Sequence, residues 1–318
     1  MTFRGKFTAM GREDVVIEKS SGESETISVA NLKEVRFDQE PSQLLAARSN
    51  ERSGAFDSAL EKLNTIQSEY DGTDSRLKTE IEFLIARTQG RKALTDPSNL
   101  DAAIQQLQNF RTANGTNFRY LEASLLQAEL LAAKGDTTTG KSLLQEVQAS
   151  AVKGYQLQAG VQLGRLLLAA GDVDGALAAF NQVVSQSEGD ATASAAFYDG
   201  QLGKALCLKQ QTQPDQAIAV LDEVIAKASD SESRILAEAW VRKGDCLRQK
   251  NEPKAALMAY LHVDVLYSGE TAQHAEALLN LSRLWGPSGH QDRAQDAAAR
   301  LSERYPNSQF AKQLGAGG

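Results

Sequence analysis

The recurrence of small side chains at a similar interval constrains this chain more than any other feature. From residue 42 onward the apolar residues recur with a period of about 3.6, which is typical of α-helices. Within this region small residues recur at separations of 36 to 44 residues. They are Ala59, Ala103, Gly140, Ala176, Ala217, Ala256 and Ala294. The recurrence predicts stacked helix pairs, since one pair alone cannot cover its own apolar face.

One copy of the repeat, residues 163–184, shows the pattern most clearly. Gly164 is a small residue in a first helix, and Gly171 marks the turn that follows it. Ala176 is the small residue of a second helix, and it is followed by the large Phe180. Small residues let the two helices approach closely, and we expect the large residue to fill the gap to the next pair.

These residues match the pattern of the tetratricopeptide (TPR) repeat, and the chain resembles that family from about residue 42 to 306. The resemblance implies an α-solenoid of about seven helix pairs whose first helices line a concave face. It also implies that extended peptides or partner helices bind on that face. Because the family repeat is 34 residues long, the longer and uneven spacing here predicts a less regular superhelix.

A second resemblance concerns residues 255–267 and 304–308, which are similar to segments of bacterial cell-envelope TPR proteins. Those proteins are exported scaffolds and assembly factors. No signal peptide is visible, and the chain runs almost directly into a strand-like segment at Phe3. We therefore expect a periplasmic or cell-envelope location if an export signal has been removed, and a cytoplasmic one otherwise.

The first 40 residues have the short apolar clusters and turn-rich breaks that are typical of successive β-strands. The clusters lie at Phe3–Phe7, Val15–Ile17, Ile27–Val29 and Val35–Phe37. We expect residues 1–40 to form a small antiparallel SH3- or LSm-like unit that packs on the helices, because so short a unit is marginally stable alone. Residues 41–318 then form the solenoid, with a terminal cap at 307–314 and a flexible glycine tail at 315–318.

The charge balance narrows the class of partner. The chain has 34 Lys and Arg residues against 41 Asp and Glu residues, a net charge of −7. An acidic chain has little general affinity for nucleic-acid phosphates or for an anionic membrane surface. No apolar stretch approaches the length that crosses a bilayer. Nucleic-acid binding by the β unit is a disfavoured alternative, since its acidic residues also outnumber its basic ones.

Residues 135–142 match the phosphate-binding pattern G-x-x-x-x-G-K-S, which would make the chain a nucleotide-binding enzyme. In that chemistry Lys141 would reach the terminal phosphates and Ser142 would hold magnesium. The pattern works only after a buried strand, and residues 120–134 are rich in alanine and leucine and predict a helix. The match also falls in register with the turn at Gly171. We therefore interpret it as a turn between helices and disfavour the enzyme.

Residues capable of metal or nucleophilic chemistry are few and scattered. The histidines are His262, His274 and His290, and none has a second histidine or cysteine at metal-ligand spacing. Cys207 and Cys246 lie in apolar helical patterns and are expected to be buried free thiols. The sequence predicts a non-enzymatic protein without a cofactor or metal.

The TPR register suggests where a partner binds. Arg165, Lys204 and Arg283 each directly follow a small residue of a first helix, and Arg242 and Arg248 flank Gly244. These side chains could form a basic stripe on the concave face, suited to a protein or peptide with an acidic segment. The competing interpretation is a set of ordinary solvated charges. The leading functional prediction is a protein–protein interaction scaffold.

Overall fold

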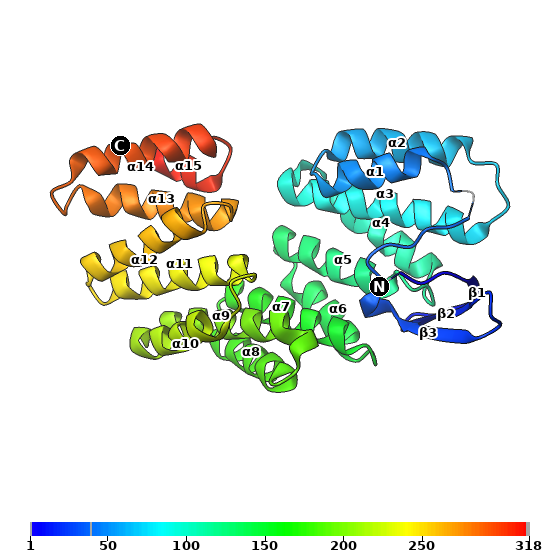
Figure 1. Ribbon diagram of the computed structural model, residues 1–318, viewed down its shortest axis with the longest axis horizontal. Coiled ribbons are helices and arrows are strands. Elements are labelled where there is room, and N and C mark those ends of the chain that lie inside the picture. The colour runs from blue at the N-terminus through cyan, green and yellow to red at the C-terminus, as the bar shows by residue number, and fades with distance from the viewer. Residues whose placement is uncertain (1, 39, 316–318) are drawn as a thin grey trace. The chain divides into compact units, whose positions relative to one another are not determined.

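The computed structural model describes residues 2–38 and 40–315, and it divides into two compact units (Figure 1). Unit 1 is Met1–Leu166 and unit 2 is Leu167–Gly318. The strands of unit 1 are β1 (Lys6–Met10), β2 (Asp14–Glu18) and β3 (Ser24–Ser28). Its helices are α1 (Gln43–Arg52), α2 (Phe56–Glu69), α3 (Ser75–Thr95), α4 (Leu100–Ala113), α5 (Tyr120–Lys134) and α6 (Thr137–Gln148).

The boundary between the units falls within α7 (Lys153–Ala169). Unit 2 then contains α8 (Val173–Ser187), α9 (Ser194–Gln210), α10 (Pro214–Lys227), α11 (Ser233–Gln249), α12 (Pro253–Leu266), α13 (Thr271–Trp285), α14 (Gln291–Arg304) and α15 (Gln309–Gly315). Short 3₁₀ turns occur at η1 (Val29–Asn31), η2 (Pro97–Asn99) and η3 (Ala191–Ala193). Over the described residues, the helices follow one another as seven pairs with α15 last, which confirms the predicted mainly α architecture.

The small residues that define the repeat are buried, each in the second helix of its pair. Ala59, Ala176, Ala217 and Ala256 have no exposed surface at all. In α9, a Cβ atom built on Gly203 would lie 2.3 Å from the ring of Phe180 on α8. The ring of Phe180 therefore fills the gap to the following pair, as the sequence pattern predicts.

The turn between α5 and α6 shows how the sequence separates two helices. Gly135 follows α5 with a φ of 86°, a left-handed conformation that glycine adopts without steric cost. The next residue, Asp136, caps α6, and its carboxylate accepts a 3.0 Å hydrogen bond from the backbone N–H of Thr139. Gly140 lies inside α6 and is buried. The segment that matches a phosphate loop is thus a helix–turn–helix connection, and the residues directly before it form helix α5.

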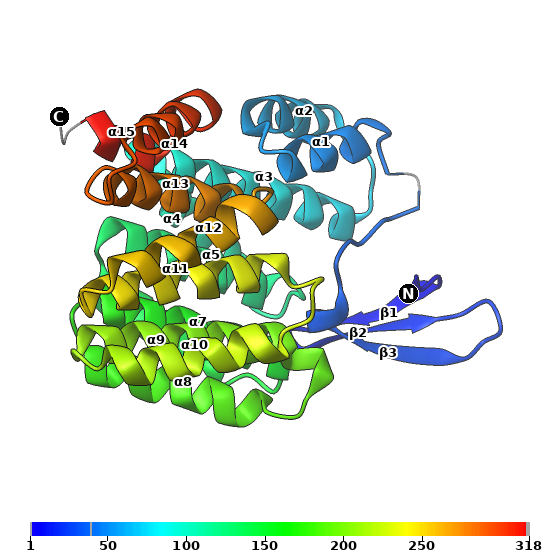
Figure 2. The same ribbon diagram turned by 60° about the vertical axis from the view of Figure 1, so that its left-hand side comes forward.

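The N-terminal residues form a three-stranded antiparallel sheet in the order β1–β2–β3 (Figures 1 and 2). Val15, Ile17 and Ile27 are buried on one face of it. The expected fourth strand at Val35–Phe37 does not form, although both side chains are buried. The carbonyl of Val35 instead accepts a 2.9 Å hydrogen bond from Arg48 of α1. That part of the prediction is wrong because a helix, and not a strand, satisfies this backbone group.

The C-terminal segment forms a short helix after the last pair. Helix α15 packs against α13 and α14, and Phe310 and Leu314 contact the core of unit 2. Gly315 ends this helix, whereas residues 316–318 of the predicted glycine tail lie outside the described residues. Within the part of the chain that the structure describes, no helix is both long and apolar enough to cross a membrane.

Candidate functional site

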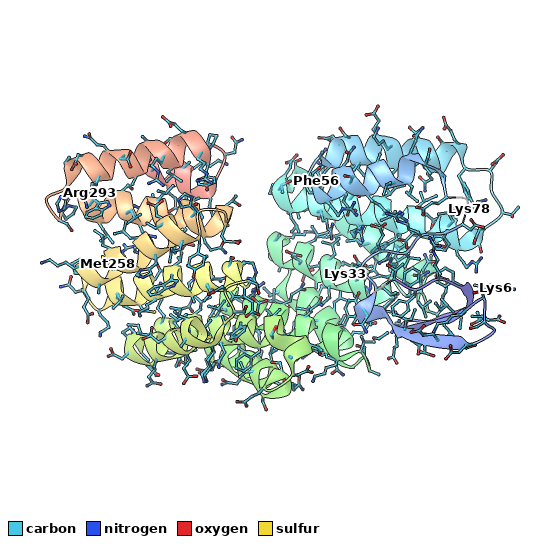
Figure 3. All side chains as sticks on the ribbon, in the orientation of Figure 1. Lys6, Lys33, Phe56, Lys78, Met258 and Arg293 are labelled. Carbon is cyan, nitrogen blue, oxygen red and sulfur yellow. The ribbon has the colours of Figure 1, made fainter. Side chains whose placement is uncertain are left out.

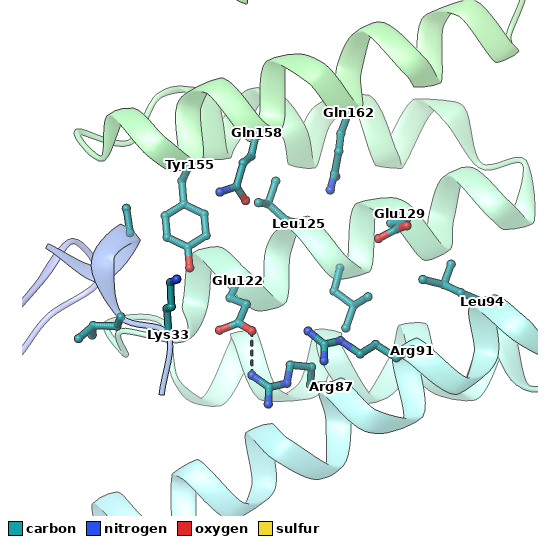
Figure 4. Close-up of a pocket in the computed structure, with 13 residues that line it drawn as sticks. Lys33, Arg87, Arg91, Leu94, Glu122, Leu125, Glu129, Tyr155, Gln158 and Gln162 are labelled. Atoms are coloured by element: carbon teal, nitrogen blue, oxygen red, sulfur yellow. Dashed lines mark hydrogen bonds and ion pairs between the residues drawn. The ribbon is translucent and has the colours of Figure 1, made fainter. Parts of the chain in front are cut away.

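Unit 1 contains a cavity of ≈ 510 Å³ lined by the first helices of three consecutive pairs (Figure 4). One wall comes from α3 and the opposite wall from α7, with α5 between them. The segment that includes η1 lies at one end. We call this cavity the groove. Its lining residues are Ala30, Leu32, Lys33, Arg87, Arg91, Leu94, Glu122, Leu125, Leu126, Glu129, Tyr155, Gln158 and Gln162.

The groove residues recur in register from one repeat to the next. Arg87, Glu122 and Gln158 are separated by 35 and 36 residues, and so are Arg91, Leu126 and Gln162. Because the two sets lie one helical turn apart, both face the groove from α3, α5 and α7. The site is therefore a product of the repeat itself: each pair presents the same face of its first helix.

A chain of alternating charges joins the first helices beneath the groove. The Arg119 guanidinium makes two hydrogen bonds to Glu80, of 2.9 and 2.6 Å, and a third to Glu122. Arg87 then joins Glu122 to Glu51, at 3.0 and 2.7 Å. Arg91 also contacts Glu51. This ladder ties α1, α3 and α5 together.

Burial makes the ladder a rigid part of the structure. Glu51, Glu80 and Arg119 are at most 4% exposed, so removal of any one of them would leave its partner as an uncompensated buried charge. Although burial opposes ionisation of Glu122, the guanidinium groups of Arg119 and Arg87 hold its pKa below the ordinary value. These buried ion pairs therefore hold the floor of the groove in place.

Other polar groups in the groove remain available to a ligand. Lys33 is exposed and forms no ion pair with any described residue. Gln158 is also exposed, and the buried side-chain oxygen of Gln162 has no hydrogen-bond donor among the described atoms. Glutamine amides offer both donors and acceptors. Burial raises the pKa of the Glu129 carboxyl above its ordinary value.

The N-terminal β unit is held firmly against the helices of unit 1. The Arg12 guanidinium lies 3.6 Å from the ring centre of Tyr120, and its Nε donates a 3.0 Å hydrogen bond to the carbonyl of Gly115. The Glu13 carboxylate accepts a 3.0 Å hydrogen bond from the backbone N–H of Ala151. Lys33 lies on the helix side of the unit, whereas Lys6 lies at its outer edge (Figure 3).

Among the predicted basic residues, Arg165 lies on α7 and is exposed. It follows the same register as Leu94 and Glu129, 36 residues after Glu129. Its charge also acts on Glu129, lowering the pKa of that carboxyl against the effect of burial. Arg165 therefore belongs to unit 1, beside the groove.

The other four predicted residues belong to unit 2. Arg242 of α11 pairs with Glu276 of α13 at 2.7 Å and with Asp245 at 3.2 Å. Arg248 donates a hydrogen bond of 2.5 Å to Asn280. Lys204 is half-buried on α9, and Arg283 is exposed on α13. Arg242 and Arg248 thus tie α11 to α13, so the structure gives them an internal role; whether any of the five contacts a partner stays a prediction.

Sequence reasoning missed most of the groove, including Lys33, Arg87, Glu122, Tyr155 and Gln158. The helical members could have been found from the spacing of 35 or 36 residues between equivalent positions in the first helices of the second, third and fourth pairs. Lys33 had no such signal, because it lies in the irregular segment after the strands. Only the docked position of the β unit brings it to the helices.

The cysteines and histidines, which could carry nucleophilic or metal chemistry, do not line the groove. Cys207 and Cys246 are buried free thiols, and burial raises the pKa of each to about 11. His274 is also buried, with hydrogen bonds to Asp264 and Tyr305. Among the described residues, no group of three metal-ligating side chains comes together.

Comparison with known proteins agrees with this architecture. Models of the tetratricopeptide repeat match residues 167–237 and 276–308. No curated protein sequence matches the chain.

Three solved structures illustrate the similarity of fold. A tetratricopeptide repeat protein from Parabacteroides merdae has a TM-score of 0.59 at 15% identity, covering 85% of this chain and 95% of that one. A Rap protein complexed with competence and sporulation factor has a TM-score of 0.59 at 11% identity, covering 86% and 78%. PilW, a type IV pilus biogenesis factor, has a TM-score of 0.52 at 14% identity, covering 74% and 97%.

Proposed function

We propose that this chain, a tetratricopeptide-repeat protein, is a non-enzymatic scaffold that binds an extended segment of a protein partner in the groove of unit 1. The observation that carries the proposal is the ≈ 510 Å³ groove lined by the first helices α3, α5 and α7. Its floor is fixed by buried ion pairs, while Gln158, Gln162 and Lys33 keep polar groups for a ligand.

The dimensions of the groove suit a short stretch of extended chain. Tyr155 and Gln162 are seven residues apart on α7, which corresponds to roughly 10 Å along a helix. An extended peptide rises about 3.3 Å per residue, so the groove holds about three residues. Leu94, Leu125 and Leu126 offer apolar contact, and the glutamine amides can bond to the peptide backbone.

The similar structures support a protein partner without identifying it. The Rap structure contains a bound factor, and PilW is described as a factor of pilus biogenesis. Both share only the fold with this chain. We propose a partner segment bound by shape and hydrogen bonding, with no chemical step, in line with a turn at residues 135–142 where a nucleotide site would need a strand.

A selection from short random peptides displayed on bacteriophage tests the proposal. The full chain should enrich a set of related peptides. Gln158→Trp should lose that set, because the larger ring occupies the groove from an exposed position. The matched control is Gln145→Trp, an exposed position on α6 outside the groove. Enrichment that survives in Gln158→Trp as fully as in the control would contradict the proposal.

The predicted basic stripe remains a second proposal for how a partner is oriented. Arg165 lies beside the groove, whereas Lys204 and Arg283 lie in unit 2. We expect the triple substitution of these residues by alanine to reduce recovery of an acidic partner in a pull-down at low salt. Unchanged recovery would remove the stripe from the account and leave the groove standing.

A further inference from the structure

We propose that the N-terminal β unit forms part of the binding groove and that its Lys33 selects an acidic side chain of the bound segment. The inference rests on the proposed function and adds to it a chemical preference at one position of the ligand. It also gives the β unit a role: the unit completes the site instead of only covering the first helices.

The contribution of the β unit begins with the backbone of residues 30–33. Ala30, Leu32 and Lys33 line the same cavity as α3, α5 and α7. A Cβ atom built on Gly154, one residue after the start of α7, would lie 3.0 Å from the Cβ of Ala30. A side chain at position 154 would press on Ala30, so this segment lies directly against the helix that forms one wall.

The position of this segment is fixed at both ends. Before it, Arg12 and Glu13 bind the connections that precede α5 and α7. After it, the Arg48 guanidinium binds the carbonyl of Val35 and the carboxylate of Glu40, both at 2.9 Å. A groove wall held in this way is preformed, so a ligand does not have to order it.

Lys33 differs from the other cations that line the groove. Arg87 donates hydrogen bonds to Glu51 and Glu122, and Arg91 donates one to Glu51. Lys33 has no acidic partner among the described residues and is exposed. Its side chain points toward the hydroxyl of Tyr155, which is a second donor at the same end (Figure 4).

Two donors that converge on one end of a groove favour a carboxylate. Glu122 is one of the two acidic lining residues, and its charge is already offset by Arg87 and Arg119. The remaining positive charge at this end is that of Lys33. An aspartate or glutamate of the bound segment would accept hydrogen bonds from Lys33 Nζ and Tyr155 Oη, which are stronger than neutral ones.

The sequences of peptides selected by phage display test the inference directly. The displayed peptides are fused to the coat protein through their C-terminal ends, so any carboxylate must come from a side chain. We expect the wild-type chain to enrich peptides with Asp or Glu at one position. In Lys33→Glu that preference should change to Lys or Arg, and the best acidic peptide should bind roughly ten- to hundredfold more weakly.

Lys141→Glu serves as the matched control, because Lys141 is an exposed lysine of unit 1 on α6, away from the groove. It should keep the wild-type preference and affinity. If the wild-type and Lys33→Glu chains enrich the same peptides, the role of Lys33 is refuted while the proposed function stands. If the wild-type chain enriches no peptides, the proposed function fails and the inference fails with it.

Discussion

Gly203 shows how much one missing methyl group contributes to the packing between repeats. The ring of Phe180 has no exposed surface, and it occupies the space that a Cβ on Gly203 would need. Gly203→Ala should destabilise unit 2 by about 1–2 kcal/mol, because overpacking of about 1–3 kcal/mol exceeds the helix propensity that alanine gains. Urea denaturation followed by circular dichroism measures the change.

Gly140→Ala is the contrasting substitution. A Cβ at this helical position would meet its nearest atom, Leu166 Cδ2, at 3.4 Å, an ordinary contact. The higher helix propensity of alanine should then stabilise unit 1 by roughly 0.5–1 kcal/mol. If Gly140→Ala destabilised the protein as much as Gly203→Ala, the explanation by local space would be wrong.

Asp264 makes the stability of unit 2 depend on pH in the acidic range. Although burial opposes its ionisation, hydrogen bonds from His274 and Arg300 lower the pKa of Asp264 to about 2. Since the unfolded value is about 3.9, the ionised group stabilises the fold above about pH 4. That contribution is lost as the pH falls through 4 toward 2.

Asp264→Asn should therefore cost about 2 kcal/mol of unfolding free energy at neutral pH and flatten the loss of stability between about pH 4 and 2. Denaturation curves collected across this range measure both effects. Asp296→Asn is the control, because the Asp296 side chain is 69% exposed and lies 3.8 Å from Arg300. Equal effects from the two substitutions would contradict the assignment.

Among whole elements, the docking of the β unit depends strongly on Arg12. Arg12→Ala removes the contact with the Tyr120 ring, the hydrogen bond to Gly115 and the ion pair with Glu146. Amide hydrogen exchange in β2, β3 and η1 should accelerate about tenfold, which corresponds to roughly 1.4 kcal/mol of lost protection. Arg4→Ala, at an exposed position, should leave these rates unchanged.

The helices could be predicted from the sequence because their apolar period and their small residues are local signals. The terminal helix α15 and the turn at Gly135 belong to this class. The prediction of a fourth strand was wrong. The alternation of Val35 and Phe37 indicates that both side chains are buried, but it does not indicate which residues cover them. Phe37 packs on the ring of Phe7 in β1, and the Val35 carbonyl accepts a hydrogen bond from Arg48 of α1, so contacts with other elements decide the conformation.

For the molecule as a whole, the sequence indicated which helices line a common face but not which of their side chains line the groove. The resemblance to the TPR family implied that first helices line a common concave face, and the groove of unit 1 is lined by such helices. The predicted residues followed a basic pattern, yet Arg242 forms an ion pair with Glu276 of the next first helix. Only side-chain packing shows which charges are paired and which, such as Lys33, have no acidic partner among the described residues.

The measurement that tests the central claim most directly is site-specific photocrosslinking in the native cell. A benzoylphenylalanine residue replaces Gln158, which lines the groove, or Gln145, which lies outside it on α6. We expect a partner protein to crosslink to position 158 and not to position 145, with less crosslinking when Lys33 is also changed to glutamate. Crosslinking of the same partner from position 145 alone would contradict binding in the groove.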